Sequence, residues 1–200
     1  MKKHKTVNRV LIFGLSLLGI VFIAIFLMVL FSPYGNQEGR DGKLVESKIL
    51  INAPVEQIFA YLGDSDNASE WSVFVDHISP LNSHEVSDGS PGSIRRCFVK
   101  KDEKRKSWDE EVLAVDLNKR RLLSCYNYRE FVLTAGILNT EQLYEETKDG
   151  HCLLSLTLFF PQEKTSFLKH LKMYYAAYQV SYLFEENLKN IKKFNEDGNR

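Results

Sequence analysis

Hydrophobic positions follow three successive patterns along the 200-residue chain. A continuous apolar run comes first, from Val10 to Phe31. Short apolar stretches separated by Gly, Pro and Asp turns then fill residues 44–160, which is typical of an antiparallel sheet. Beyond Pro161 the apolar residues recur at three- and four-residue spacing up to Phe194, which predicts one long amphipathic helix. The pattern predicts an α+β domain preceded by an apolar helix.

The apolar run, residues 10–31, contains no charged side chain and is long enough to cross a bilayer as a helix, which takes about 20 residues. Residues 1–9 hold four basic side chains and no acidic one. This bias predicts a cytoplasmic N-terminus and a domain on the opposite, periplasmic or extracytoplasmic, side. A cleaved signal peptide is the main alternative, but residues 29–33 offer no small-x-small cleavage site. A helix buried in a soluble core is the third. We expect a retained single-pass transmembrane anchor.

Residues 32–43 are rich in glycine and polar side chains, which predicts a linker between the anchor and a domain spanning residues 44–195. The domain is expected to open with a strand from Leu44 to Ile51. A short helix follows, with Pro54 in its first turn, and then a helical turn at 68–71. Further strands are expected at 75–81, 93–100, 108–115, 121–128, 140–146 and 152–160. Residues 195–200 are expected to fray.

Charge and cysteine content narrow the choice of function. The formal net charge is zero, but four of the 26 basic residues precede the apolar run, so the remainder carries 22 basic and 26 acidic residues. The lysines of residues 100–106 are interleaved with acids, so nucleic-acid binding is not expected. Cys97, Cys125 and Cys152 lie far apart in the chain. We expect buried free thiols, although one disulfide remains open, and no metal or other cofactor.

The element order and the segment Ile49–Trp71 together resemble the START-like (SRPBCC) superfamily, which includes polyketide cyclase/dehydrase and lipid-transport proteins. The matching positions are Ala53, Pro54, Ile58, Phe59, Leu62, Asp64, Trp71 and Gly92, with the Trp108–Val115 strand and the terminal helix. The resemblance covers about residues 44–194. It implies a helix-grip fold, in which a bent antiparallel sheet wraps around the C-terminal helix and leaves an apolar cavity. It further implies a hydrophobic ligand in that cavity and no universal catalytic residue.

Several side chains are candidates to meet such a ligand. Tyr126 and Tyr128 are two residues apart in a predicted strand and should face one side, although tyrosines packed with one end in water are the simpler alternative. Glu110 and Glu111 should face opposite sides, so one carboxylate points inward unless a bulge or an open mouth intervenes. Glu110 is the weak candidate for acid–base chemistry. The aromatic cavity candidates are Trp71, Phe74, Trp108, Tyr126, Tyr128, Tyr174 and Tyr178.

Three functions remain open at this level. The preferred one is a membrane-tethered carrier or sensor for a hydrophobic small molecule or lipid, with no catalysis, because an anchor would hold the cavity near lipid. The second is an enzyme of the cyclase, dehydratase or hydrolase type that uses Glu110 and tyrosine hydroxyls. Convergence of ionisable groups in the cavity would favour it. The third is a protein-interaction module that docks a partner on the sheet or on residues 129–139.

Overall fold

The computed structural model describes residues 2–37, 40–131, 136–161 and 165–197. The chain divides into two compact units, Met1–Ser32 and Pro33–Arg200. The first unit holds the helix α1, Lys2–Leu30. Within it, Ile12–Leu30 has a mean hydropathy of 2.9 over 19 residues and none of its length is buried. By length and composition this helix can cross a membrane.

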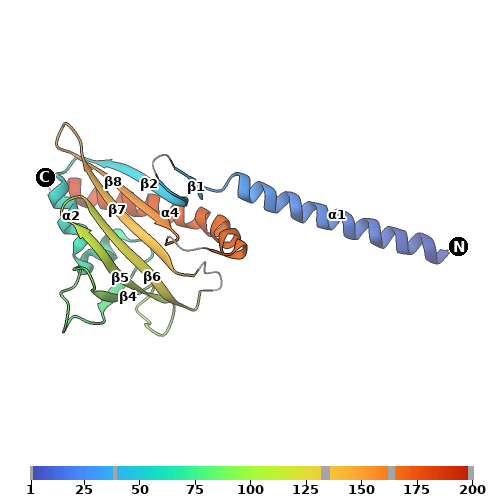
Figure 1. Cartoon of the computed structure of the whole chain (residues 1–200), viewed down its shortest axis with the longest axis horizontal. Coiled ribbons are helices and arrows are strands. Elements are labelled where there is room, and N and C mark those ends of the chain that lie inside the picture. The colour runs from blue at the N-terminus through green and yellow to red at the C-terminus, as the bar shows by residue number, and fades with distance from the viewer. Residues whose placement is uncertain (1, 38–39, 132–135, 162–164, 198–200) are drawn as a thin grey trace. The chain divides into compact units, whose positions relative to one another are not determined.

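The described residues of the second unit form one antiparallel sheet of eight strands in the order β1-β2-β8-β7-β6-β5-β4-β3 (Figure 1). Strand β2 pairs with β8, so the beginning and the end of the sheet's sequence lie side by side. The strands are β1 (Gly35–Asn36), β2 (Lys43–Ile51), β3 (His77–Pro80), β4 (Ile94–Phe98), β5 (Ser107–Asp116), β6 (Arg120–Arg129), β7 (Leu138–Glu146) and β8 (Cys152–Phe159).

Short helices connect β2 to β3, and one long helix follows β8. They are α2 (Val55–Gly63), the 3-10 turn η1 (Ser65–Asn67), α3 (Ala68–Trp71) and α4 (Phe167–Asp197). Helix α2 forms because Val55, Ile58, Phe59 and Leu62 recur at helical spacing, and all four are buried. Asp64 then ends α2, and its carboxylate accepts a hydrogen bond from the Asp66 backbone N–H at 3.0 Å. This turn directs the chain into α3 and toward the sheet.

Helix α4 runs along the sheet and buries one face against it (Figure 1). Near its C-terminal end, Leu188 and Ile191 join a hydrophobic cluster with Ile51 and Leu154. Near its start, the buried Met173 and Ala177 belong to a second cluster that includes Val45, Leu138 and Tyr34. These two clusters fix α4 at both ends, and the stretch between them is left to face the interior of the domain.

The predicted order of strands and helices is confirmed, with differences at the two ends of the domain. The predicted linker contains β1, which pairs with β2, and Tyr34, which is only 3% exposed. The expected fraying is wrong for residues 195–197, because α4 continues to Asp197 and Asn195 is 4% exposed. The Gln57 amide donates to the Asn195 carbonyl at 3.1 Å and holds this last turn. Residues 198–200 lie outside the described chain.

Two further expectations concern loops and cysteines. Residues 129–139 are expected from the sequence as a strand extension or a covering loop. Residues 132–135 lie outside the described part, while Arg129 ends β6 and Leu138 begins β7. Cys97, Cys125 and Cys152 are free and buried, as expected from their spacing.

Candidate ligand cavity

A cavity of about 280 Å³ lies between the sheet and α4, with α3 and the residues that follow it as a further wall. This volume is close to the lower end of the range for small-molecule sites, about 300–1,000 Å³. Most of the lining is apolar and comes from elements far apart in the sequence. The apolar lining includes Trp71, Phe74, Trp108, Leu123, Leu156, Met173 and Phe184.

Helix α4 supplies one wall of the cavity through a single face. Met173, Ala176, Val180, Leu183 and Asn187 all line the cavity and follow one another at three- and four-residue intervals. The same spacing produces the buried stripe of the helix. In the middle of that stripe, Ala176, Val180 and Leu183 face the cavity, whereas at both ends the stripe packs against side chains of the sheet.

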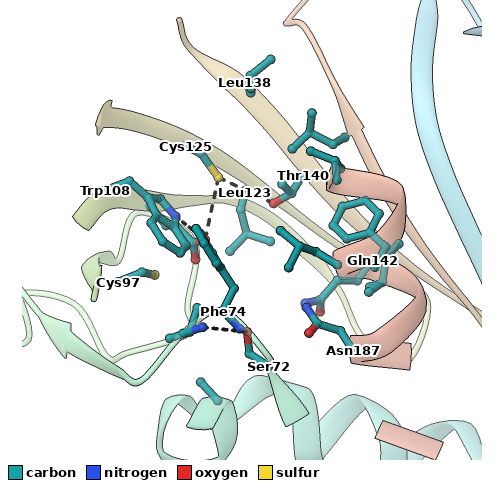
Figure 2. Close-up of a pocket in the computed structure, with 18 of the residues that line it drawn as sticks. Ser72, Phe74, Cys97, Trp108, Leu123, Cys125, Leu138, Thr140, Gln142 and Asn187 are labelled. Atoms are coloured by element: carbon teal, nitrogen blue, oxygen red, sulfur yellow. Dashed lines mark hydrogen bonds between the residues drawn. The ribbon is translucent and has the colours of Figure 1, made fainter. Parts of the chain in front are cut away.

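Aromatic side chains build the opposite wall. The rings of Phe74 and Trp108 are stacked, with centroids 5.7 Å apart and planes inclined by 23°. Phe131 packs 6.2 Å from each of these rings and 5.8 Å from Tyr128. Figure 2 shows Cys97, Trp108 and Cys125 on one side of the cavity, and Gln142 and Asn187 on the other. Offset and edge-to-face packing of this kind stabilises a rigid apolar surface.

An ion pair between β4 and β5 makes one part of the cavity wall polar. Arg95 Nε donates to Glu110 Oε2 at 3.2 Å, and Arg95 Nη1 donates to Ser65 Oγ at 3.1 Å. The second carboxylate oxygen, Oε1, accepts from Trp108 Nε1 at 2.9 Å and from the thiol of Cys125 at 3.8 Å. Both oxygens of Glu110 therefore receive donors from neighbouring side chains, which holds the carboxylate in place.

Burial and charge act in opposite directions on Arg95. The residue is 7% exposed, and burial works to lower the pKa of its guanidinium. The negative charges of Glu110 and Asp88, the Cys97 thiol and the hydrogen bond to Glu110 together outweigh burial, so the pKa of Arg95 is raised above its usual value. Burial, together with the nearby Cys125 and Glu110, also raises the pKa of Tyr128 far above its ordinary value. The cavity therefore holds a cation and a neutral phenol.

The segment after α3 is fixed to α4 by two asparagines. Asn187 Oδ1 accepts the Val73 backbone N–H at 2.8 Å, and Asn190 Nδ2 donates to the Trp71 carbonyl at 3.2 Å. The indole N–H of Trp71 is buried and has no hydrogen-bond partner among the residues that the structure describes. A buried donor without an acceptor costs about 1–3 kcal/mol.

The structure brings five of the eight candidate side chains to the cavity and leaves three outside. Those that line it are Trp71, Phe74, Trp108, Glu110 and Tyr128. The three that do not are Tyr126, Tyr174 and Tyr178.

The expectation that Tyr126 and Tyr128 face the same side of the sheet is wrong, and the cause is an irregularity in the strand between them. Leu123 and Cys125 face the cavity, so regular alternation would bring residue 127 inward next. Asn127 instead has a left-handed backbone with φ of 51°, beside a register shift in the β5–β6 pairing. This irregularity turns Tyr128 inward and leaves Tyr126 outside the cavity.

Tyr174 and Tyr178 lie off the cavity-facing stripe of α4. Tyr174 packs against Tyr34, with ring centroids 5.3 Å apart, and its hydroxyl accepts a hydrogen bond from Lys43. Tyr178 is 42% exposed. The residues that sequence reasoning missed are Arg95 and Asn187. Arg95 alternates with Cys97 in its strand, which places both on the inward face and was a usable signal.

Within the described ranges, no group of three or more His, Cys, Asp or Glu side chains is placed to hold a metal ion. His77 lies 3.0 Å from the Asp76 carboxylate, stacks on Phe98 and does not line the cavity. The chemistry that the cavity offers is therefore that of an apolar container with a cation–carboxylate pair and a neutral phenol.

A bent antiparallel sheet closed by one long C-terminal helix over an apolar cavity defines the helix-grip class of the START-like superfamily. The sequence profile of the family described as polyketide cyclase / dehydrase and lipid transport matches residues 43–194, and the chain belongs to this family. No curated protein matches the chain in sequence.

Solved structures of the same fold are similar to this chain over most of the second unit. A protein from Nitrosospira multiformis superposes with a TM-score of 0.59 and 13% identity, covering 78% of this chain and 99% of that one. Ara h 8.0201 gives 0.57 and 13%, covering 77% and 97%. The di-domain ARO/CYC StfQ from the steffimycin biosynthetic pathway gives 0.54 and 15%, covering 78% and 51%. At these identities the likeness shows the fold alone.

Proposed function

We propose that this protein is a membrane-tethered binding protein, a carrier or sensor, for a hydrophobic small molecule or lipid. The observation that carries the proposal is the cavity of about 280 Å³ with its largely apolar lining. Apolar surface facing an unfilled cavity lacks favourable packing contacts, so an apolar ligand that fills it is stabilised.

The polar side chains of the cavity narrow the ligand class. A purely hydrocarbon ligand would make no use of Arg95, Glu110 and Tyr128, which line the cavity. Arg95 has two of its donors committed to Glu110 and Ser65, and a guanidinium has five. A mostly apolar molecule with one oxygen-bearing group, such as a carbonyl, hydroxyl or carboxylate, fits the apolar lining together with these polar side chains. The proposed ligand is therefore amphiphilic.

Helix α1 supports the membrane part of the proposal. Its apolar stretch is long enough to span a bilayer, and the positive residues before it favour a cytoplasmic N-terminus with the helix-grip domain on the opposite side. The proposed division is residues 1–9 as the cytoplasmic tail, 10–31 as the membrane span and the remainder as the exported domain. Protease treatment of intact and permeabilised cells tests this topology, since only an exported domain is digested without permeabilisation.

Native mass spectrometry of the full chain, purified in a mild detergent, tests ligand binding. We expect a co-purifying mass that denaturation releases. Ala176→Trp places a large side chain into the cavity from α4 and should reduce ligand occupancy at least ten-fold. Val180→Trp fills the cavity from a second position of the same helix. Tyr182→Trp, at a position 61% exposed, adds the same indole outside the cavity and should leave occupancy unchanged. Equal occupancy in folded Ala176→Trp, Val180→Trp and Tyr182→Trp would refute the proposal.

The convergence of Arg95 and Glu110 in the cavity favours a second candidate, an enzyme of the cyclase, dehydratase or hydrolase type. A positioned carboxylate beside a cation can act on a bound carbonyl compound as a base and an electrostatic stabiliser. Incubation of the protein with its extracted ligand distinguishes the two functions. A new product mass that Glu110→Gln abolishes supports the enzyme, whereas unchanged ligand supports the carrier or sensor.

A further inference from the structure

The first turn of α4 exposes two large apolar side chains. Phe167 is 78% exposed and Leu168 is 67% exposed, in adjacent positions of the first turn. Ile137, which is 55% exposed, follows Gly136, and Gly136 lies next to the Lys169 side chain of α4. A Cβ placed on Gly136 would be 3.5 Å from Lys169 Cε. Clustered exposed apolar residues are typical of surfaces that bind a partner or a membrane.

Charge along the first half of α4 is of one sign. Lys169 and Lys172 are exposed on the first two turns of α4. From residue 165 to residue 184 the sequence contains these two lysines and no acidic residue. Apolar side chains flanked by lysines are typical of helices that lie in the headgroup region of an anionic bilayer.

The chain itself brings this surface close to the proposed membrane span. Tyr34 is buried against His170 of α4, with ring centroids 6.0 Å apart, and against Phe160 at 6.3 Å. Tyr34 is only four positions after Leu30, the last residue of α1. Four residues span at most about 14 Å. An anchor in the bilayer therefore leaves little chain between the membrane and the residues that hold the start of α4.

We propose that Ile137, Phe167 and Leu168 form a membrane-docking surface, which inserts into the lipid interface while Lys169 and Lys172 meet anionic headgroups. The proposal rests on the membrane anchor of the proposed function and deepens it, because it names the bilayer as the partner of the domain as well as of α1. Met173 and Ala176 line the cavity one to two turns beyond this surface. A lipid leaving the bilayer there would have a short path to the cavity.

Lipid-phase quenching of a fluorophore on the full chain in nanodiscs tests the docking surface. The fluorophore NBD is attached at Leu168→Cys, and the nanodiscs contain phosphatidylcholine and phosphatidylglycerol with a nitroxide-labelled lipid. The matched control is Leu117→Cys, which is 75% exposed in the β5–β6 turn at the other end of the domain. The native cysteines are buried, so the unsubstituted chain should take up little label.

We expect several-fold stronger quenching at position 168 than at position 117. Lys169→Gln should weaken the docking equilibrium about five-fold, and nanodiscs of phosphatidylcholine alone should weaken it by about the same factor for each of the two lysines. Equal quenching at positions 168 and 117 overturns the proposal. The proposal is also overturned if the NBD emission at position 168 changes with protein concentration and not with lipid. That result would indicate that a second copy of the chain covers the surface. Ligand occupancy, measured by native mass spectrometry on the same samples, reports on the cavity separately.

Discussion

Arg95 of β4 and Glu110 of β5 are Cα partners in the sheet, and their side chains meet at the cavity wall with 3.2 Å between Nε and Oε2. Side-chain exposure is only 9% and 14%, respectively. Because so little water reaches this ion pair, removing one partner leaves the other as a buried, unpaired charge, which destabilises the fold.

Glu110→Gln should lower the free energy of unfolding by about 3 kcal/mol, because it leaves the guanidinium of Arg95 buried without its counter-charge. Urea denaturation of the Pro33–Arg200 unit measures the change. Glu111→Gln, on the opposite face of the same strand, is the matched control and should change stability by less than about 0.5 kcal/mol. Equal effects of the two substitutions would show that the Arg95–Glu110 pair contributes little.

The two tryptophans of the chain, Trp71 and Trp108, both line the cavity. We expect the amphiphilic dye anilinonaphthalene sulfonate, bound in the cavity, to accept energy from them on excitation of the indoles. Trp71→Phe and Trp108→Phe should each reduce this sensitised emission, while the emission on direct excitation of the dye changes little. Sensitised emission that survives both substitutions would place the dye outside the cavity.

Tyr34 is expected to act as part of the domain core, although it follows the apolar helix by only a few residues. Tyr34→Ala removes a ring that is 3% exposed and packed on Phe160, His170 and Tyr174, so it should cost about 3–4 kcal/mol of unfolding free energy. Tyr34→Phe loses only the hydroxyl and should cost about 1 kcal/mol. Urea denaturation distinguishes them, with Tyr175→Ala, at a 58% exposed position, as a control expected to have little effect.

The buried thiols predict a loss of stability at alkaline pH. Burial raises the pKa of Cys97 and of Cys125 well above the ordinary value, and raises the pKa of Cys152 to about 11. The unfolded chain therefore releases these protons first, at about pH 8.5. The contribution of the thiols to stability is complete below that pH and is lost as the pH rises toward the folded-state pKa values.

Between about pH 8.5 and 10, each buried thiol should reduce the free energy of unfolding by up to about 1.4 kcal/mol per pH unit. Urea midpoints across this range measure the slope. Alanine substitution of Cys97 and Cys125 should make the slope shallower than in the unsubstituted domain. An identical slope with and without these thiols would mean that other groups cause the pH dependence.

Much of the fold could be predicted because its signals are local. The four buried residues of α2 follow a helical repeat, and α3 spans the same residues, 68–71, that the sequence indicated. Turns also formed where expected, since Gly89 and Gly92 have positive φ values of 76° and 87° between β3 and β4. A helical repeat or a turn residue acts within a few positions, so it is readable without knowledge of distant partners.

The cavity side chains were less predictable because each depends on contacts across the sheet. Trp71, Phe74 and Trp108 were found through the family resemblance and apolar character. Tyr128 lines the cavity although Tyr126 does not, because the left-handed Asn127 between them shifts the strand by one position and strict alternation no longer holds. A single irregular residue reverses the facing of everything after it in a strand, and its occurrence depends on the pairing with β5.

The order of the residues was enough to predict an apolar helix long enough to span a membrane, and an antiparallel sheet followed by a long final helix. The burial of Tyr34, the pairing of Arg95 with Glu110 and the continuation of α4 to Asp197 are visible only in the folded domain. The physical reason is the range of the interactions. Helical and strand periodicities arise between near neighbours, whereas burial and ion pairing arise between residues that only the folded sheet and helix bring together.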